Sequence, residues 1–173
     1  MAEFDPSPIT RTLGQFVASF RVVPAAAMVV ACVGIVDVIG LMLGAGVEPV
    51  VKAVQRAVGT GASSGYATVL FSARCSRAGD AAFVNTTAAH AFAMDDVAWG
   101  THPSAVLFPA LLAVGEQLGA SGADLLRAWV VGYEVLAELA SRDPDSLHAA
   151  RWHPSGAART SRSRCGHMQP PGL

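Results

Sequence analysis

Two histidines of this sequence, His102 and His153, each stand directly before a Pro-Ser pair. A residue that precedes proline is pushed towards an extended backbone, which holds such a histidine at the mouth of the segment that the proline begins. The N-terminus of a following helix favours anions, and an imidazole ring can pass protons near neutral pH. The two segments therefore predict a site for proton transfer on an anionic substrate.

Two adjacent carboxylates, Asp95 and Asp96, lie shortly before His102 in the stretch DDVAWGTHPS. Because carboxylates beside imidazoles can support acid–base chemistry, we predict Asp95, Asp96, His102 and His153 as the catalytic residues. Plainer interpretations stay open at this stage. The aspartates could be turn formers, His102 could be only a helix-entry residue, and His90 is interpreted as an ordinary core or surface histidine.

A metal site competes with this interpretation, because the same residues and His90 could supply nitrogen and oxygen ligands. No two histidines have the i, i+4 spacing of a zinc-binding helix, and the three cysteines form no Cys-x-x-Cys pair. The sequence also contains no phosphate-binding loop or dinucleotide fingerprint, and the glycine-rich stretch GTGASSG, which lacks the lysine of a phosphate-binding loop, is interpreted as a linker. We therefore predict no metal and no cofactor.

The composition restricts the class of protein. Hydrophobic residues make up 52% and charged residues 14% of the 173 residues, whereas about 25% charged residues are usual. The sequence thus suits a buried layer of an assembly or a protein with an apolar partner surface. A net charge of −1 gives no electrostatic signature of nucleic-acid binding. Three widely spaced cysteines favour a reducing, cytoplasmic location.

The segment 22–47 is long and apolar enough to cross a bilayer, with Asp37 as its only charge. A carboxylate near the bilayer centre costs about 2.5–3.5 kcal/mol on insertion scales. The acidic start MAEFDPSP is also unlike a signal peptide. We therefore predict no membrane insertion, and we expect this helix to be buried on all sides in a helical protein.

Capping and proline signals predict an all-α domain with short connections. Helices are expected to begin at Ser7-Pro8, at Pro24 with an end at Gly44 or Gly46, within VEPVVKAVQRAV, at Asp80, at Pro103 with an end at Gly119, and at Ser121. The spacing of Ser121 and Asp124 fits a capping box in which Asp replaces the usual Glu. YATVLF is the one expected strand.

The stretches AAFVNTTAAHAFAMDD, THPSAVLFPALLAVGEQLGASGADLLRAWVVGYEV and RWHPSG follow one another in this order. Together they resemble the MmgE/PrpD family, which includes 2-methylcitrate dehydratase, cis-aconitate decarboxylase and iminodisuccinate epimerase. VDVIGLMLGAG is similar to an early helix of the family. The resemblance covers residues 8–156, the MmgE/PrpD-like helical domain.

The resemblance implies a helical first domain followed by an α/β lid, homodimerisation, no metal, and proton abstraction next to a carboxylate of a small di- or tricarboxylate. His102 matches the histidine of the family's His-Pro-Ser segment, and His153 matches its second His-Pro histidine. Asp95 and Asp96 match the last two aspartates of the pattern His-Ala-Leu-Asp-Tyr/Phe-Asp-Asp-Thr.

The sequence departs from the family pattern at several positions. Ala93 stands where the pattern has its first aspartate, Val97 replaces its threonine, and Asn85-Thr86-Thr87 replaces Asn-Gly-Thr. Residues 157–173 are rich in Arg, Ser and Pro and are expected to form a disordered tail outside the family domain. We expect a truncated or frameshifted family member that lacks the lid and the family's later active-site lysine, and is inactive.

Two functions of other classes remain as alternatives. The first is a non-catalytic interaction protein that binds a partner through an apolar surface. The second is a small membrane protein anchored by residues 22–47.

Overall fold

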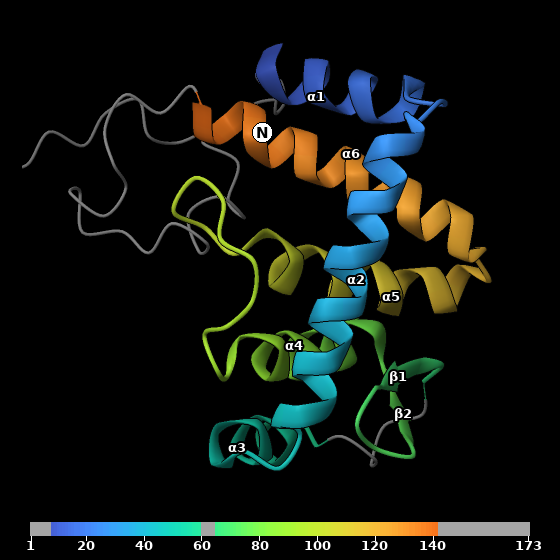
Figure 1. Ribbon diagram of the computed structural model, residues 1–173. Coiled ribbons are helices and arrows are strands. Elements are labelled where there is room, and N and C mark those ends of the chain that lie inside the picture. Colours follow the sequence, from blue (N-terminus) through green and yellow to red (C-terminus); the bar gives the residue numbers. More distant parts are fainter. Residues whose placement is uncertain (1–7, 60–64, 142–173) are drawn as a thin grey trace, which may run out of the picture.

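The structure is a computed structural model, and it describes residues 8–59 and 65–141. Six helices and one hairpin follow one another in the described residues (Figure 1). These are α1 (Pro8–Ser19), α2 (Ala25–Ala45), α3 (Pro49–Ala57), β1 (Ala67–Val69), β2 (Arg74–Ser76), α4 (Ala78–His90), α5 (Pro103–Leu118) and α6 (Gly122–Ser141). The predicted all-α class is confirmed.

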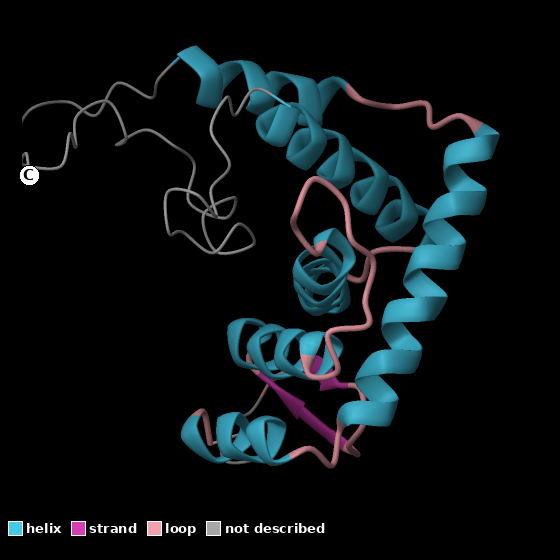
Figure 2. Cartoon of the chain, turned by 60° about the vertical axis from the view of Figure 1, so that its left-hand side comes forward, coloured by secondary structure: helices cyan, strands magenta, loops and turns pink. Residues whose placement is uncertain are grey.

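The long helix α2 runs along one side of the domain and the other helices lie to one side of it (Figures 1 and 2). α1 and α6 pack together at one end, and α3 lies at the other. α4 and α5 occupy the middle, where they contact each other and α2. α4, α5 and α6 each pack against the next helix in the chain, and α2 contacts all three of them.

Local sequence signals explain where most helices begin and end. α5 begins at Pro103, whose missing N–H costs nothing in the first turn, and ends at Gly119, whose φ of 64° is left-handed. Before α6, the Ser121 hydroxyl accepts a hydrogen bond from the Asp124 N–H at 3.2 Å, and the Asp124 carboxylate accepts one from the Ser121 N–H at 3.3 Å. The predicted capping box is therefore present with Asp in place of Glu.

Two local expectations need correction. α4 begins at Ala78 after the extended residue Arg77, so Asp80 lies in the first turn and is not the cap. Asp80 still suits that position, since a carboxylate there interacts favourably with the helix dipole. The expected strand YATVLF is limited to β1, which pairs antiparallel with β2 in a hairpin that the sequence analysis did not anticipate.

A buried amide holds this hairpin on α4. Asn85 is completely buried, and its side chain donates to the Thr68 carbonyl at 2.8 Å and accepts from the Leu70 N–H at 3.1 Å. The Glu116 carboxylate accepts two further hydrogen bonds, from the N–H and the hydroxyl of Thr68. Buried polar groups are retained where such partners satisfy them, so Asn85 has a structural task.

The core consists largely of small side chains, which lets the helices approach closely. Alanine and valine predominate among its members: Ala31, Ile35, Val38, Met42, Ala45, Val51, Ala67, Val69, Ala81, Val84, Ala88, Ala89, Ala105, Phe108, Ala113, Trp129 and Val130. Where α6 packs against α5, a Cβ on Gly132 would lie 2.8 Å from Leu107 Cδ2. A core of this kind is sensitive to added volume.

The expectation that α2 is buried on all sides is wrong. Only one face packs into the domain, through Ala31, Ile35, Val38, Met42 and Ala45. The opposite face is apolar and exposed, with Val29, Val33 and Val36 each about two-thirds accessible to solvent. α2 is long and apolar enough to span a membrane, and 17% of its most apolar 18-residue stretch is buried in the protein. The part of the domain that the structure describes packs against one face of this edge helix.

Candidate functional site

The loop between α4 and α5 folds back on itself, and this places its carboxylates. Trp99 and Gly100 both have positive φ angles, 52° and 69°, as in the tight turn that reverses an antiparallel pair. Ala98 and Thr101 flank this turn and exchange two backbone hydrogen bonds of 3.1 and 2.9 Å. The chain therefore returns to the end of α4 before α5 begins.

Asp95 lies between two histidines at the base of this loop. Its side chain is fully buried, with Oδ1 2.8 Å from His90 Nδ1 and Oδ2 3.1 Å from His102 Nδ1. The first contact has hydrogen-bond geometry. The second contact is 0.3 Å longer and lacks this alignment, so the interaction between His102 and Asp95 is electrostatic. The two imidazole rings are 4.4 Å apart between centroids and tilted by 60°.

The two histidines of this His–Asp–His cluster are each held by the end of a helix, and Asp95 lies in the loop between them. His90 is the last residue of α4, and His102 is the N-cap of α5 with an extended φ of −119°. The ψ angle of His102 is 80°, which avoids the α region that Pro103 disfavours but is short of the fully extended backbone expected from the sequence. The side chains of His90 and His102 keep 37% and 22% of their surface exposed. The cluster thus combines a buried anion with two imidazoles that solvent can reach.

Asp96 has different contacts from its neighbour. Its carboxylate accepts hydrogen bonds from the Ser104 N–H at 3.0 Å, the Ser104 hydroxyl at 2.9 Å and the Tyr133 hydroxyl at 3.0 Å. An anion at this position caps the N-terminus of α5, where N–H groups have no partner within the helix. Burial, and then the nearby Asp96 charge, raise the pKa of Tyr133 well above its usual value of 10.0.

Aromatic rings cover this side of the site. Tyr133 lies between Trp129, at 4.7 Å between centroids, and Trp99, at 5.6 Å in an edge-on arrangement. Trp129 is buried and packs near Gly34 of α2, where a Cβ would come within 3.0 Å of the indole. The loop is thus fixed to α6 by packing as well as by hydrogen bonds, and α6 in turn packs against α2.

The structure brings together three of the four residues predicted from the sequence: Asp95, Asp96 and His102. His153 lies outside the described residues, as does the predicted tail from residue 157. His90 was interpreted as an ordinary histidine, yet it is the second imidazole on Asp95. His90 ends a helix five residues before Asp95, but this spacing alone does not indicate a contact. The two side chains meet only because the loop after α4 folds back.

Two of the departures from the family pattern lie in this loop. Ala93 and Val97 are both exposed, on either side of the buried Asp95. Ala93 has a φ of 50°, a left-handed conformation in which Asp and Asn are more common than Ala. The loop therefore keeps a backbone suited to an acidic residue at position 93, although the carboxylate is missing.

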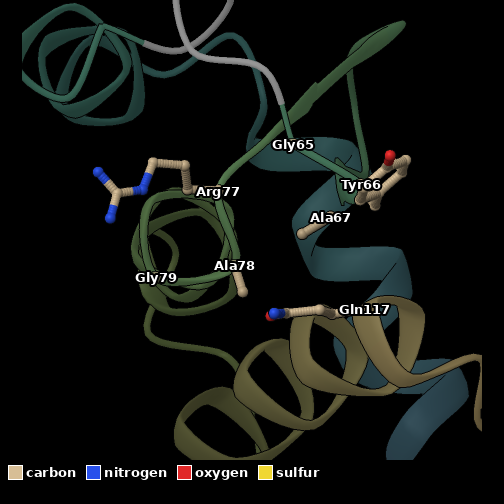
Figure 3. A pocket seen from close by; sticks show the side chains of 7 residues that line it. All are labelled: Gly65, Tyr66, Ala67, Arg77, Ala78, Gly79 and Gln117. Atoms are coloured by element: carbon tan, nitrogen blue, oxygen red, sulfur yellow. The ribbon is translucent and has the colours of Figure 1, made fainter.

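A surface pocket of about 380 Å³ lies elsewhere, between the hairpin, the start of α4 and the end of α5. Figure 3 shows Tyr66, Arg77 and Gln117 around it, with the Arg77 side chain extending away from Ala78 and Gly79. Among the residues that the structure describes, its lining contains no histidine and no carboxylate. It lacks the groups needed for proton transfer, so we place the candidate site at the His–Asp–His cluster.

The fold and the cluster define a helical domain that presents acid–base side chains where two helices meet. The sequence matches the MmgE/PrpD N-terminal domain over residues 11–163, and the chain therefore belongs to the MmgE/PrpD family. A search of curated proteins gives no match.

Proposed function

We propose that the His–Asp–His cluster is a proton-transfer site of the lyase or isomerase type, which acts next to a carboxylate of a small di- or tricarboxylate. The observation that carries this proposal is the contact of His102 Nδ1 with the buried carboxylate of Asp95. Family membership is consistent with it. No nucleic acid or cofactor takes part in the proposed chemistry, and we propose a cytoplasmic location.

The proposed division of roles follows from this geometry. The negative charge of Asp95 close to His102 Nδ1 would favour the tautomer that carries its proton on that nitrogen, which would make Nε2 the basic atom. His102 would then take the proton from the substrate carbon through Nε2. Asp95 would orient the ring and stabilise the imidazolium that forms. Asp96 would keep α5 and its N-terminal dipole in place near the substrate anion.

The groups missing at positions 93 and 97 lower the expected rate. Loss of one positioned polar group costs about 2.7–4 kcal/mol in the transition state. We therefore expect no measurable dehydration of 2-methylcitrate and no measurable decarboxylation of cis-aconitate by the purified chain. Replacing Ala93 by Asp and Val97 by Thr restores the pattern at exposed positions that accept both side chains.

Proton exchange in D₂O tests the proposal, because it reports the first step even where the full reaction is slow. NMR would follow deuterium incorporation next to the carboxylates of 2-methylcitrate. The Ala93→Asp/Val97→Thr variant should exchange at least about 100-fold faster than the wild-type chain. Adding His102→Ala should abolish this gain, whereas adding Tyr66→Phe in the separate pocket should not. Equal exchange with and without His102 would contradict the proposal.

We also propose that the outer face of α2 forms a homodimer interface. Val29, Val36 and Leu43 recur every seven residues on this face, and all are exposed. Apolar residues at this spacing let two helices pack along their length. Exposed apolar surface of this extent is usually covered by a partner.

The same face supports the second candidate function, a non-catalytic interaction protein with an apolar partner surface. The membrane-anchor alternative is less favourable, since Asp37 is exposed near the middle of α2 and would meet lipid. Carbonate extraction distinguishes the interaction protein from the membrane anchor, because a peripheral or soluble protein is washed off membranes. Retention in the membrane fraction would support the anchor.

A further inference from the structure

We propose that His90 is a positioning residue of this site, which holds the carboxylate of Asp95 in the orientation that His102 needs. This role rests on the proposed proton transfer and adds to it, since the division of roles above gives His90 no task. His90 Nδ1 lies 2.8 Å from Asp95 Oδ1 with hydrogen-bond geometry. A carboxylate only accepts hydrogen bonds, so this contact requires the proton of the neutral His90 ring on Nδ1.

The two contacts of Asp95 differ in what they can fix. The contact with His102 Nδ1 is 3.1 Å long and lacks hydrogen-bond alignment, so it does not set the plane of the carboxylate. The aligned contact with His90 does set it, because a hydrogen bond weakens steeply when the N–H points away from its acceptor. With Oδ1 held by His90, Oδ2 stays directed towards His102.

His90 is itself held firmly enough for this task. It ends α4 directly after Ala88 and Ala89, which are completely buried, and α4 packs against α2 and α5. The His90 ring also contacts the His102 ring at 4.4 Å between centroids. A rigid partner matters in such a site, because a misplacement of about 1 Å can slow a reaction by about 100-fold.

The ends of the two helices give the histidines different roles. His102 caps the N-terminus of α5, where the positive end of the helix dipole favours an anionic substrate. His90 lies at the C-terminus of α4, where the dipole has the opposite sign and disfavours anions. The substrate carboxylate is therefore expected beside His102, and His90 acts on the reaction through Asp95.

A matched pair of substitutions separates positioning from proton transfer. His90→Asn keeps an N–H donor at the place of Nδ1 but cannot take up a proton, whereas His90→Phe keeps a ring and removes the donor. In the Ala93→Asp/Val97→Thr chain, His90→Phe should slow deuterium incorporation into 2-methylcitrate by about 100-fold. His90→Asn should recover at least about 10-fold of that loss, the smaller effect usual for an outer-shell partner.

Two results of this comparison would overturn the proposal. If the His90→Asn chain is as slow as the His90→Phe chain, the ring of His90 acts in some other way than as a donor to Asp95. If the His90→Phe chain is as fast as its parent, His90 has no part in the reaction. Circular dichroism would check that both variants keep their helices.

Nitrogen NMR of the imidazoles tests the same contact without a substrate, and for the unsubstituted chain it needs no variant to fold. At about pH 8, where an unperturbed histidine is neutral, His90 and His102 should both carry their proton on Nδ1. The Nδ1–H form of His102 should lose population in His90→Phe and regain it in His90→Asn. A proton on Nε2 of His90, or a His102 signal that neither substitution changes, would overturn the positioning role.

The two measurements also separate this role from the proposed function. Expected spectra in a chain that exchanges no deuterium would contradict the proposed proton transfer and still support the hold of His90 on Asp95. Exchange that depends on His102 but not on the donor at position 90 would support the proton transfer and overturn the role of His90.

Discussion

Three donated hydrogen bonds meet at the carboxylate of Asp96, and the one from Tyr133 has a measurable pH dependence. Burial and the Asp96 charge raise the pKa of Tyr133, so folding favours its protonated form. Protonated Tyr133 therefore contributes fully to the stability of the fold below the pKa of tyrosine in the unfolded chain, which is near 10. This contribution is lost as the pH rises from there through the higher pKa of Tyr133 in the folded protein.

Tyr133→Phe should therefore lower the free energy of unfolding at pH 8 by about 1.5 kcal/mol, the lower range for a hydrogen bond to a charged acceptor. Above pH 10 the difference between wild type and variant should shrink, because the unfolded tyrosine ionises and the folded one does not. Urea unfolding of both proteins at several pH values measures this difference in the free energy of unfolding. A difference that stays constant up to pH 11 would contradict this assignment.

Ala93 offers a second test at the residue scale, since its φ of 50° is unfavourable for an L-residue. Ala93→Gly should raise the free energy of unfolding by about 1 kcal/mol. Ala91 is a matched control two residues earlier, with an ordinary helical φ of −62°. Ala91→Gly should instead lower stability by about 0.5–1 kcal/mol. If urea unfolding shows that both substitutions change the free energy of unfolding in the same direction, the positive φ of Ala93 is not the cause.

At the scale of elements, two glycines of the α2 region should respond differently to an added methyl group. The space around Gly46, which follows α2, is filled, whereas the space around Gly40 in the middle of the helix is open. A Cβ on Gly46 would lie 2.5 Å from the Phe71 ring, whereas nothing lies within 4 Å of one on Gly40. Gly46→Ala should therefore destabilise the domain by about 1–3 kcal/mol through overpacking. Gly40→Ala should stabilise it by about 0.5–1 kcal/mol through helix propensity. Thermal unfolding of both variants measures the contrast, and equal effects would argue against the tight contact with Phe71.

For the whole molecule, the exposed face of α2 predicts self-association. Sizing chromatography with light scattering should give a dimer at tens of micromolar, and Val33→Glu should give a monomer because it places a charge in the interface. Val33 is 66% exposed, so its substitution should change stability by no more than about 0.5 kcal/mol.

Leu118→Glu is the control for this prediction. Leu118 is 75% exposed and is the last residue of α5, outside the α2 helix, and its substitution should leave the dimer intact. A wild-type chain that stays monomeric at these concentrations would remove the basis for the dimer proposal. Loss of the dimer in both variants would show that added charge, and not the α2 face, is responsible.

Local sequence determined most helix boundaries of this protein. The Pro103 start, the Gly119 end and the Ser121–Asp124 capping box depend on backbone φ preferences and on hydrogen bonds between near neighbours, and the structure has all three. The all-α class follows from the same short-range signals. The motif around His102 also indicated the region of the candidate site, because proline restricts the residue before it.

Only the tertiary structure decided which side chains meet. The pairing of His90 with Asp95 requires the reversal at Trp99 and Gly100, and Asp96 reaches Tyr133 across 37 residues of sequence. The burial of α2 on one face only was equally hidden, since an all-round apolar helix has no periodicity to say which face has neighbours. Contacts between distant segments depend on how helices pack around a shared core, and no local pattern encodes that packing.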